Sequence, residues 1–187
     1  MERDRDHLRT WRTIVSLTFQ PESVESCWDE LYPLAEAHWQ GTTSYRRHEP
    51  FAPSRKRYVD YNQAGFFHLL TARDGRRMAG YFGVYVTDSM HSQLRMATED
   101  TFFLHPDYRG GRNALRFLAY IEQYCAAQGV RELLFSCEID NESGIQSLLK
   151  RLDYQPVIVQ YSKHLSTCAD SAGSSVKELH VGPSPTR

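Results

Sequence analysis

The sequence predicts a single-domain α/β fold, a mixed central sheet with helices on it. The length of 187 residues suits one domain with a sizeable core. Short stretches of strand character alternate with segments whose apolar residues recur every three or four positions. Residues 1–12 are highly charged, and serine, glycine, proline and charge dominate residues 166–187. The domain is therefore expected over residues 13–165, followed by a disordered tail.

The first elements expected are a strand and a helix. Apolar residues over 14–19 predict a short strand, which Pro21 is expected to break. From Val24 to Trp39 the apolar residues recur at helical spacing, with Ser23 as a candidate N-cap and Gly41 as a stop.

A second helix and a hairpin follow. Residues 53–64 can form a helix with an apolar side. The stretches 66–72 and 77–87 have strand composition and flank an Arg-Asp-Gly turn at 73–75, which predicts a β-hairpin. Residues 93–104 are expected to extend the sheet.

The second half of the domain is expected to alternate helices and strands. The elements predicted there are a helix ending near Gly129, a buried strand over 132–137, a helix over 141–152 and a final strand over 154–165.

The most informative stretch joins a strand, a cationic glycine turn and an amphipathic helix. Arg109, Gly110, Gly111 and Arg112 form the turn. The first backbone N–H groups of a helix have no partner within it, and the helix dipole adds positive charge there. Glycine permits close approach of a ligand, and arginine binds phosphate in a fork. The pattern predicts a phosphate-binding turn; the alternative is an ordinary loop with a solvated basic surface.

Composition restricts the classes of partner. Lysine plus arginine number 22 and aspartate plus glutamate 23, so the formal charge of −1 gives no overall attraction to nucleic acid or an anionic membrane. No run of about 18 apolar residues occurs and the N-terminus lacks a signal-peptide core, which predicts a cytoplasmic protein without a membrane partner. The four scattered cysteines and eight histidines show neither CxxC nor HExxH spacing, so no metal is expected.

The expected order of elements, with HPDYRGGRNA before a helix and NESGIQSLLKRLDY before the last strand, resembles the GNAT superfamily of acyl-CoA-dependent N-acetyltransferases. The resemblance covers about residues 13–165 and implies a mixed, mainly antiparallel central sheet flanked by helices. The run ATEDTFFLHPDYRGG is similar in particular to small GNAT proteins encoded by phages and prophages, whose substrates are generally unassigned.

The resemblance implies acetyl-CoA as the acyl donor. The family motif R/Q-x-x-G-x-G/A is matched by residues 109–114 at its first and last positions, while Arg112 replaces the central glycine. Family members bind the pyrophosphate through backbone amides of this turn and pair the pantetheine arm with the preceding strand. The cofactor-binding residues implied here are Phe102, Phe103, Leu104, Arg109, Gly110, Gly111, Arg112, Asn113, Ala114 and Asn141.

The catalytic candidates follow from direct attack of an amine on the thioester, because a base must accept the amine proton. Adjacent strand residues face opposite sides, so only one of Glu99 and Asp100 is expected to line the site. Glu99 resembles a catalytic glutamate of many family members; Asp100 is the substitute, and a solvent-facing or salt-bridged carboxylate is the structural alternative. Leu149 stands where the family carries its tyrosine acid, which leaves Tyr161, Tyr108 or a water.

The leading interpretation is transfer of acetyl from acetyl-CoA to an amine of a small molecule or protein. One alternative is a catalytically degenerate acyl-CoA-binding or interaction protein, which Arg112, Leu149 and Asp153 favour. Another is a phage-type nucleic-acid modifier that uses the basic region 45–57, although a solvated helix face explains that region better and the near-neutral charge argues against it. Homodimers are common in the superfamily, so the resemblance implies that this protein can form a homodimer.

Overall fold

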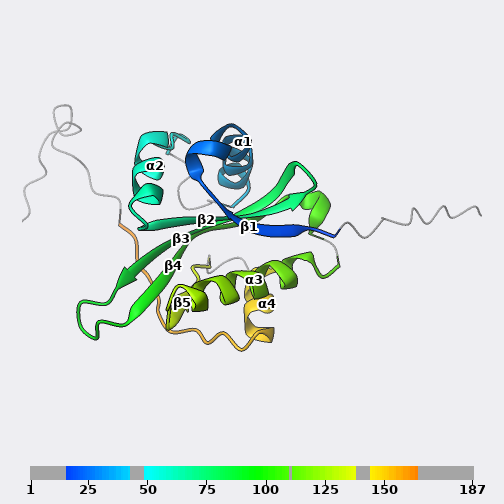
Figure 1. Cartoon of the computed structure of the whole chain (residues 1–187). Helices are drawn as coiled ribbons and strands as arrows, with labels where there is room; N and C mark the ends of the chain where they lie inside the picture. The colour runs from blue at the N-terminus through cyan, green and yellow to red at the C-terminus, as the bar shows by residue number, and fades with distance from the viewer. Residues whose placement is uncertain (1–15, 43–48, 110, 138–143, 164–187) are drawn as a thin grey trace, which may run out of the picture. The chain divides into compact units, whose positions relative to one another are not determined.

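The computed structural model describes residues 16–42, 49–109, 111–137 and 144–163. It contains a five-stranded mixed sheet with strand order β1-β2-β3-β4-β5, flanked by helices (Figure 1). The chain divides into two units, one ending at Leu148 and one beginning at Leu149. The sheet and the first three α-helices belong to the first unit. The predicted fold class is confirmed.

The strands are β1 (Thr18–Glu22), β2 (Phe67–Asp74), β3 (Arg77–Asp88), β4 (Arg95–Leu104) and β5 (Glu132–Leu134). The helices are α1 (Val24–Thr42), α2 (Arg55–Gln63), the short 3-10 helix η2 (Pro106–Tyr108), α3 (Asn113–Ala127) and α4 (Ile145–Arg151). Strands β1 to β4 pair antiparallel in chain order, and β4 pairs with β5 in parallel because α3 crosses over between them.

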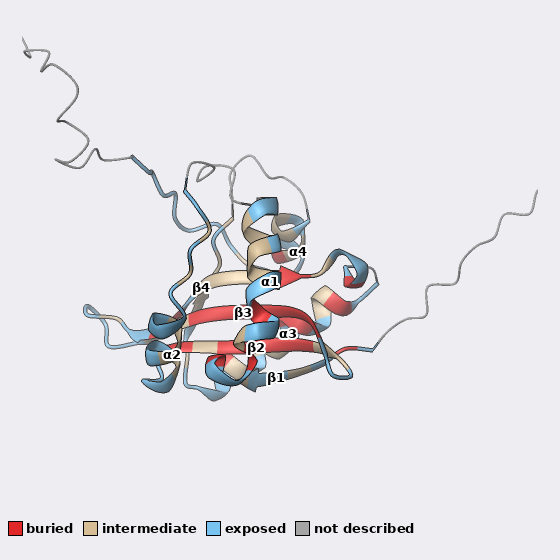
Figure 2. Cartoon of the chain, turned by 90° about the horizontal axis from the view of Figure 1, so that it is seen from above, coloured by how far each residue is buried: buried red, intermediate tan, exposed pale blue. Residues whose placement is uncertain are grey.

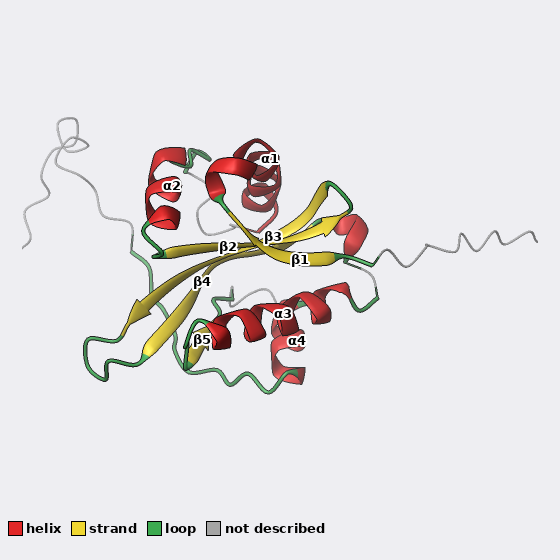
Figure 3. Cartoon of the chain, in the orientation of Figure 1, coloured by secondary structure: helices red, strands yellow, loops and turns green. Residues whose placement is uncertain are grey.

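Helices α1 and α2 cover one face of the sheet and α3 covers the other (Figure 3). On the α1 face, Val24 and Leu31 belong to one buried cluster with Tyr81 of β3 and Phe103 of β4. Figure 2 shows the buried residues concentrated along the central strands. Because successive strand residues alternate between faces, β4 contributes its next aromatic residue, Phe102, to the opposite layer.

The α3 face is built on aromatic rings. Phe117 of α3 is fully buried and stacks on Phe19 of β1, with ring centroids 5.0 Å apart and an interplanar angle of 8°. Its ring also lies 5.7 Å from that of Phe102. The helix that follows the glycine turn is thereby packed against both β1 and β4 on this face.

The first strand differs from its prediction. Residues 14 and 15 lie outside the described residues, and β1 continues through Pro21, which pairs with Leu70 of β2. A proline has no N–H to donate, but an edge strand needs no partner on its outer side. The expectation that Pro21 breaks this strand was wrong for that reason.

Helix α1 also continues beyond its prediction, since Gly41 lies inside it and Thr42 is its last residue. At its start, the Val24 N–H donates to Asn62 Oδ1 of α2, at 3.1 Å. This bond joins the beginning of α1 to the end of α2.

The β2–β3 hairpin and α2 were predicted correctly, with shifts of one or two residues at their ends. The hairpin turns at Gly75 and Arg76, and Gly75 has a φ of +58°, which glycine adopts without strain. Helix α2 has Ser54 as its N-cap, whose side chain accepts a hydrogen bond from the Arg57 N–H at 3.3 Å.

Replacing Ser54 with alanine is expected to destabilise α2 by about 1 kcal/mol, because one of its first N–H groups loses its acceptor. None of the residues of α2 is fully buried, so the cap contributes more to its local stability than it would in a helix with a buried face. Faster amide hydrogen exchange within α2 is the measurement. The Ser54→Asp variant keeps an acceptor and should retain protection; equal exchange in both variants would contradict the capping role.

The final strand of the prediction is absent from the second unit, whose described residues end at 163. Residues 154–163 have no regular structure, and Val157, Ile158 and Val159 are exposed. The chain leaves α4 through a turn in which the Tyr154 N–H donates to the Leu149 carbonyl at 3.1 Å. An apolar run indicates strand propensity only; a strand also needs a pairing partner, and these residues form no ladder.

Strand β5 is shorter than predicted. It ends at Leu134, and its residues are intermediate or exposed where a buried strand over 132–137 was expected. Helix α4 begins at Ile145, while the first predicted residues of this helix, 141–143, lie outside the described residues.

Candidate active site

A β-bulge shapes the strand that precedes the turn. Gly83 of β3 pairs with Thr101 and the next residue, Val84, pairs with Glu99, so Asp100 is the extra residue of β4. Glu99 shares a face with Val84, which lies on the α3 side of the sheet. Asp100 lies on the other side, where its carboxylate accepts a hydrogen bond from Tyr58 of α2 at 3.2 Å. The two carboxylate candidates therefore occupy opposite faces.

Glu99 lies where β4 and β5 stop pairing. The last pair of the parallel ladder is Thr98 with Leu134. Immediately beyond it, the Ser136 backbone N–H donates to Glu99 Oε2 at 3.1 Å. Burial raises the pKa of Glu99 to about 7, with a further contribution from the Asp100 charge, while N–H groups of Ser136 and Phe102 oppose the rise. A carboxylate with such a pKa is roughly half ionised at neutral pH and can take up a proton from an amine.

Beyond the bulge, one edge of β4 has no neighbouring strand among the described residues, because the ladder with β5 ends at Thr98. The His105 N–H donates to Ala79 of β3 at 2.8 Å. Because strand residues direct their backbone groups alternately to either side, Leu104 and Phe102 direct theirs away from β3. The Phe102 N–H contacts the Glu99 carboxylate, and the Leu104 carbonyl accepts from Arg109 Nε at 2.7 Å.

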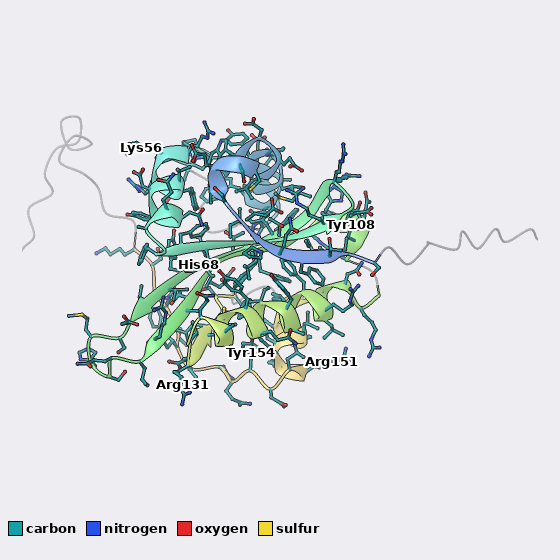
Figure 4. All side chains as sticks on the ribbon, viewed as in Figure 1. Lys56, His68, Tyr108, Arg131, Arg151 and Tyr154 are labelled. Carbon is teal, nitrogen blue, oxygen red and sulfur yellow. The ribbon has the colours of Figure 1, made fainter. Side chains whose placement is uncertain are left out.

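The 3-10 helix η2 connects β4 to the glycine turn. Its buried Tyr108 donates its hydroxyl proton to Asp74 Oδ2 at 2.9 Å, and Figure 4 shows Tyr108 beside the β2–β3 hairpin. The side chain of Asn113, at the first position of α3, donates to the Tyr108 carbonyl at 3.2 Å. His105 Nδ1 accepts a hydrogen bond from the Asp107 N–H at 3.3 Å. These bonds fix the position of the helix start.

The turn itself places a left-handed residue directly before α3. Gly111 has a φ of +69°, a conformation favourable to glycine. Arg112 is the N-cap residue with φ −104°, is exposed, and makes no side-chain capping bond. The position where the family motif has glycine therefore does not require one here, because the left-handed residue is Gly111. Gly110 lies outside the described residues.

Arg109 contacts the end of β4. Besides its bond to the Leu104 carbonyl, its guanidinium lies 5.5 Å from the ring centroid of Phe103. Burial lowers the pKa of His38 to about 4, and the charge of Arg109 adds to this decrease. Arg109 thus lies on the α1 side of the strand end.

The structure brings part of the predicted site together. Glu99, the end of β4 and residues 111–114 are consecutive parts of the first unit. Asn141 lies outside the described residues. Tyr161 belongs to the second unit, where it is 95% exposed, and its catalytic role stays a prediction.

Sequence reasoning missed two partners of the carboxylates. Ser136 binds Glu99 through its backbone N–H, and a backbone contact leaves no pattern of residue types in the sequence. Tyr58 lies in the helix predicted over residues 53–64, but its bond to Asp100 joins residues 42 positions apart. Only the packing of α2 on the sheet brings these two residues together.

Within the described residues, no group of three or more histidine, cysteine, aspartate or glutamate side chains is arranged to hold a metal ion. None of the helices described is long and apolar enough to cross a membrane.

The sheet is mixed, β4 and β5 stop pairing after Thr98, and a glycine turn and the crossover helix α3 follow β4. These features define the class expected from the sequence, an acyl-CoA-dependent transferase fold. The family model for the acetyltransferase (GNAT) family matches residues 28–154. The chain belongs to this family, whose acyl donor is acetyl-CoA, and acyltransferase activity is the activity of the family.

Solved structures agree with the fold. An aminoglycoside acetyltransferase from an uncultured soil metagenomic sample, in complex with sisomicin, superposes with a TM-score of 0.65 at 12% identity, covering 80% of this chain and 97% of that one. Ribosomal-protein-alanine N-acetyltransferase from Brucella melitensis biovar Abortus 2308 gives 0.63 at 15% identity, with 80% and 99% covered. AAC(6')-Iy in complex with the bisubstrate analog CoA-S-monomethyl-acetylneamine gives 0.60 at 13% identity, with 80% and 99% covered. No curated protein sequence matches the chain.

Proposed function

We propose that the protein is an N-acetyltransferase that transfers acetyl from acetyl-CoA to a primary amine of a small molecule or protein. The observation that carries this proposal is the Glu99 carboxylate, whose burial raises its pKa to about 7 at the point where β4 and β5 stop pairing. The amine nitrogen attacks the thioester carbonyl, the new C–N bond forms and the C–S bond breaks. Glu99 accepts the amine proton, and the CoA thiolate leaves.

The unpaired edge of β4 supports the expected place of the pantetheine arm. Backbone groups of Phe102 and Leu104 point to that edge, and amide groups of the arm can pair with them as a neighbouring strand would. The Phe102 N–H contacts Glu99, so a bound arm would compete for this donor and release the carboxylate toward the amine.

The start of α3 supports the expected place of the pyrophosphate. The first intrahelical bond of the helix runs from the Arg116 N–H to the Arg112 carbonyl, at 2.9 Å. The N–H groups of residues 113–115 precede that bond, which suits an anion at the positive end of the helix dipole. The exposed Arg112 side chain adds a cation beside them.

The identity of the general acid is the less defined part of the proposal. Tyr108 donates to Asp74, and burial raises its pKa, so its proton is held for a structural bond. Tyr161 and a water stay as predictions, and a thiolate needs little help to leave. A degenerate acyl-CoA-binding protein is the alternative. The phage-type origin, the cytoplasmic location and the homodimer also stay predictions.

Calorimetric titration with acetyl-CoA, followed by an assay of CoA thiol release with an amine, tests the proposal. Saturable binding with thiol release is expected. Binding without release from a broad set of amines would favour the degenerate protein, and no binding at millimolar concentration would overturn the proposal.

Two glycines at opposite ends of α3 provide a matched pair of variants. Gly111 and Gly129 both have positive φ, of +69° and +77°, so alanine strains the backbone at either position. We expect Gly111→Ala to weaken acetyl-CoA binding by about tenfold, and Gly129→Ala to change it less than about twofold. Calorimetry measures both dissociation constants. Equal effects would indicate that the turn has no special role in binding.

A further inference from the structure

Exposed arginines surround the glycine turn at one end of the sheet. Arg109 and Arg112 lie at the two ends of the turn, and Arg77 is the first residue of β3. The tip of the β2–β3 hairpin, η2 and the start of α3 lie at this same end (Figure 1). Among the described residues, none of these three arginines has a carboxylate within ion-pair distance. Their positive charges are therefore not compensated by contact with a carboxylate.

The side chain of Arg77 is held over η2. Its Cζ atom lies 5.9 Å from the ring centroid of Tyr108, within the range of a cation–π contact. That ring is buried, and its hydroxyl is bound to Asp74 Oδ2 at 2.9 Å. The contact restricts the positions that the guanidinium can adopt, which lowers the entropy lost when it binds a ligand.

Tyr108 also connects Arg77 to the start of α3. The side chain of Asn113, the first residue of this helix, donates a hydrogen bond to the Tyr108 carbonyl at 3.2 Å. Arg77 and the helix start therefore contact the same residue, one at its ring and the other at its backbone. The distance between them is of the order of one tyrosine residue, which a nucleotide can span.

The other cations of this region already have partners. Arg73, in the same hairpin, is paired with Glu22 and Glu30, at 2.5 and 3.0 Å. Arg116, one turn into α3, donates hydrogen bonds to residues 16 and 17, just before β1. These two arginines hold the fold together, whereas Arg77 makes no such bond among the described residues.

The two carboxylates beside Tyr108 do not offset this charge by pairing with the exposed arginines. Asp74 accepts the hydrogen bond of the Tyr108 hydroxyl, and Asp107 Oδ2 lies 3.4 Å from His105 Nδ1. The exposed Arg76 adds a further positive charge at the hairpin. Positive charge is therefore in excess at this end of the sheet, and it attracts an anion.

We propose that Arg77 binds the 3′-phosphate of acetyl-CoA, beside the pyrophosphate at the start of α3, and so selects the 3′-phosphorylated donor over its dephospho form. This phosphate is attached to the same ribose as the pyrophosphate and carries about two negative charges at neutral pH. Arginine binds such a group in a fork of two hydrogen bonds. The inference rests on the proposed function for the place of the pyrophosphate, but it concerns binding and requires no turnover.

Calorimetry with acetyl-CoA and acetyl-dephospho-CoA, which differ only in this phosphate, tests the inference. The full-length protein is expected to bind acetyl-CoA about tenfold more tightly than the dephospho form. In Arg77→Gln this preference should fall below about twofold, because only acetyl-CoA binds more weakly. Arg77→Lys keeps the charge and should retain part of the preference. Arg112→Gln should weaken both donors by the same factor, because Arg112 is expected beside the pyrophosphate.

A matched control removes the same charge elsewhere. Arg131 is exposed and lies at the opposite end of the first unit from Tyr108 (Figure 4), so Arg131→Gln should leave both dissociation constants unchanged. Equal binding of the two donors by the unsubstituted protein would overturn the inference, as would a full preference retained in Arg77→Gln. An equal loss for both donors in Arg77→Gln would also overturn it, since Arg77 would then only support Tyr108. If the preference and its loss are observed but no amine is acetylated, the proposed function fails and the inference stands.

Discussion

Glu99→Gln is expected to lower kcat by about a hundredfold to a thousandfold, while the dissociation constant of acetyl-CoA changes by less than about threefold. Glutamine has nearly the shape of glutamate and can still accept the bond from the Ser136 N–H, which the carboxylate receives at 3.1 Å. It cannot take up the amine proton, so only the proton transfer is lost. Steady-state kinetics and calorimetry measure the two quantities.

The pH dependence gives an independent check on the same group. Burial raises the pKa of Glu99 to about 7. A general base must be ionised, so kcat/KM should rise with pH through about 7 and level off above it. This rise should disappear in Glu99→Gln. Retention of the full rise would show that another group, such as the acceptor amine itself, causes it.

Stability distinguishes loss of a base from loss of structure. The pKa of Glu99 is raised in the folded protein from 4.5, so the buried carboxylate destabilises the fold once it ionises. Relative to high pH, the protonated Glu99 side chain adds to the stability of the fold. This contribution is fully present below the unfolded pKa and is lost as pH rises through the folded pKa. Glu99→Gln should therefore be more stable than the unsubstituted protein above about pH 8, by up to about 3 kcal/mol, with the difference vanishing near pH 4. Glu132→Gln, at an exposed position of β5, is the control expected to change neither activity nor stability appreciably.

Elements with strong local signals were predictable from the sequence. The β2–β3 hairpin has two strand-like stretches around a glycine turn, and α3 has a full apolar face, so local periodicity was sufficient for both. The ends of the sheet depend on pairing instead. Pro21 is tolerated because β1 lies at an edge, and residues 154–163 form no strand because no ladder includes them. Neither circumstance is encoded in the segment itself.

For the candidate site, the sequence indicated which residues to consider and left their arrangement open. Glu99 was selected as a base because its place on this strand resembles that of a catalytic glutamate in many family members, and this role stays a prediction. The bulge at Asp100 was not foreseeable, because it depends on how β4 aligns with β3 rather than on either strand alone. Likewise, the helix start could be expected near Arg112, but only the backbone angles show that the left-handed residue is Gly111.

Phe117→Ala is expected to lower the free energy of unfolding by about 3–5 kcal/mol. The side chain is fully buried, stacks on Phe19 at 5.0 Å and lies 5.7 Å from Phe102, so truncation leaves a cavity between α3 and two strands that cannot close without moving the helix. Urea denaturation measures the loss. Phe117→Leu keeps most of the volume and should cost less than about 2 kcal/mol.

The same substitution should affect the cofactor through the position of α3. Phe117 lies near the start of this helix, whose first N–H groups are expected to meet the pyrophosphate, so a displaced helix presents them in the wrong place. In folded Phe117→Ala, measured well below its unfolding temperature, acetyl-CoA should bind about tenfold more weakly. Phe66→Ala removes a half-exposed aromatic ring from the opposite face and should leave cofactor binding unchanged. A similar loss of affinity in both variants would indicate general loosening of the fold, whereas a loss confined to Phe117→Ala would tie cofactor affinity to the packing of α3.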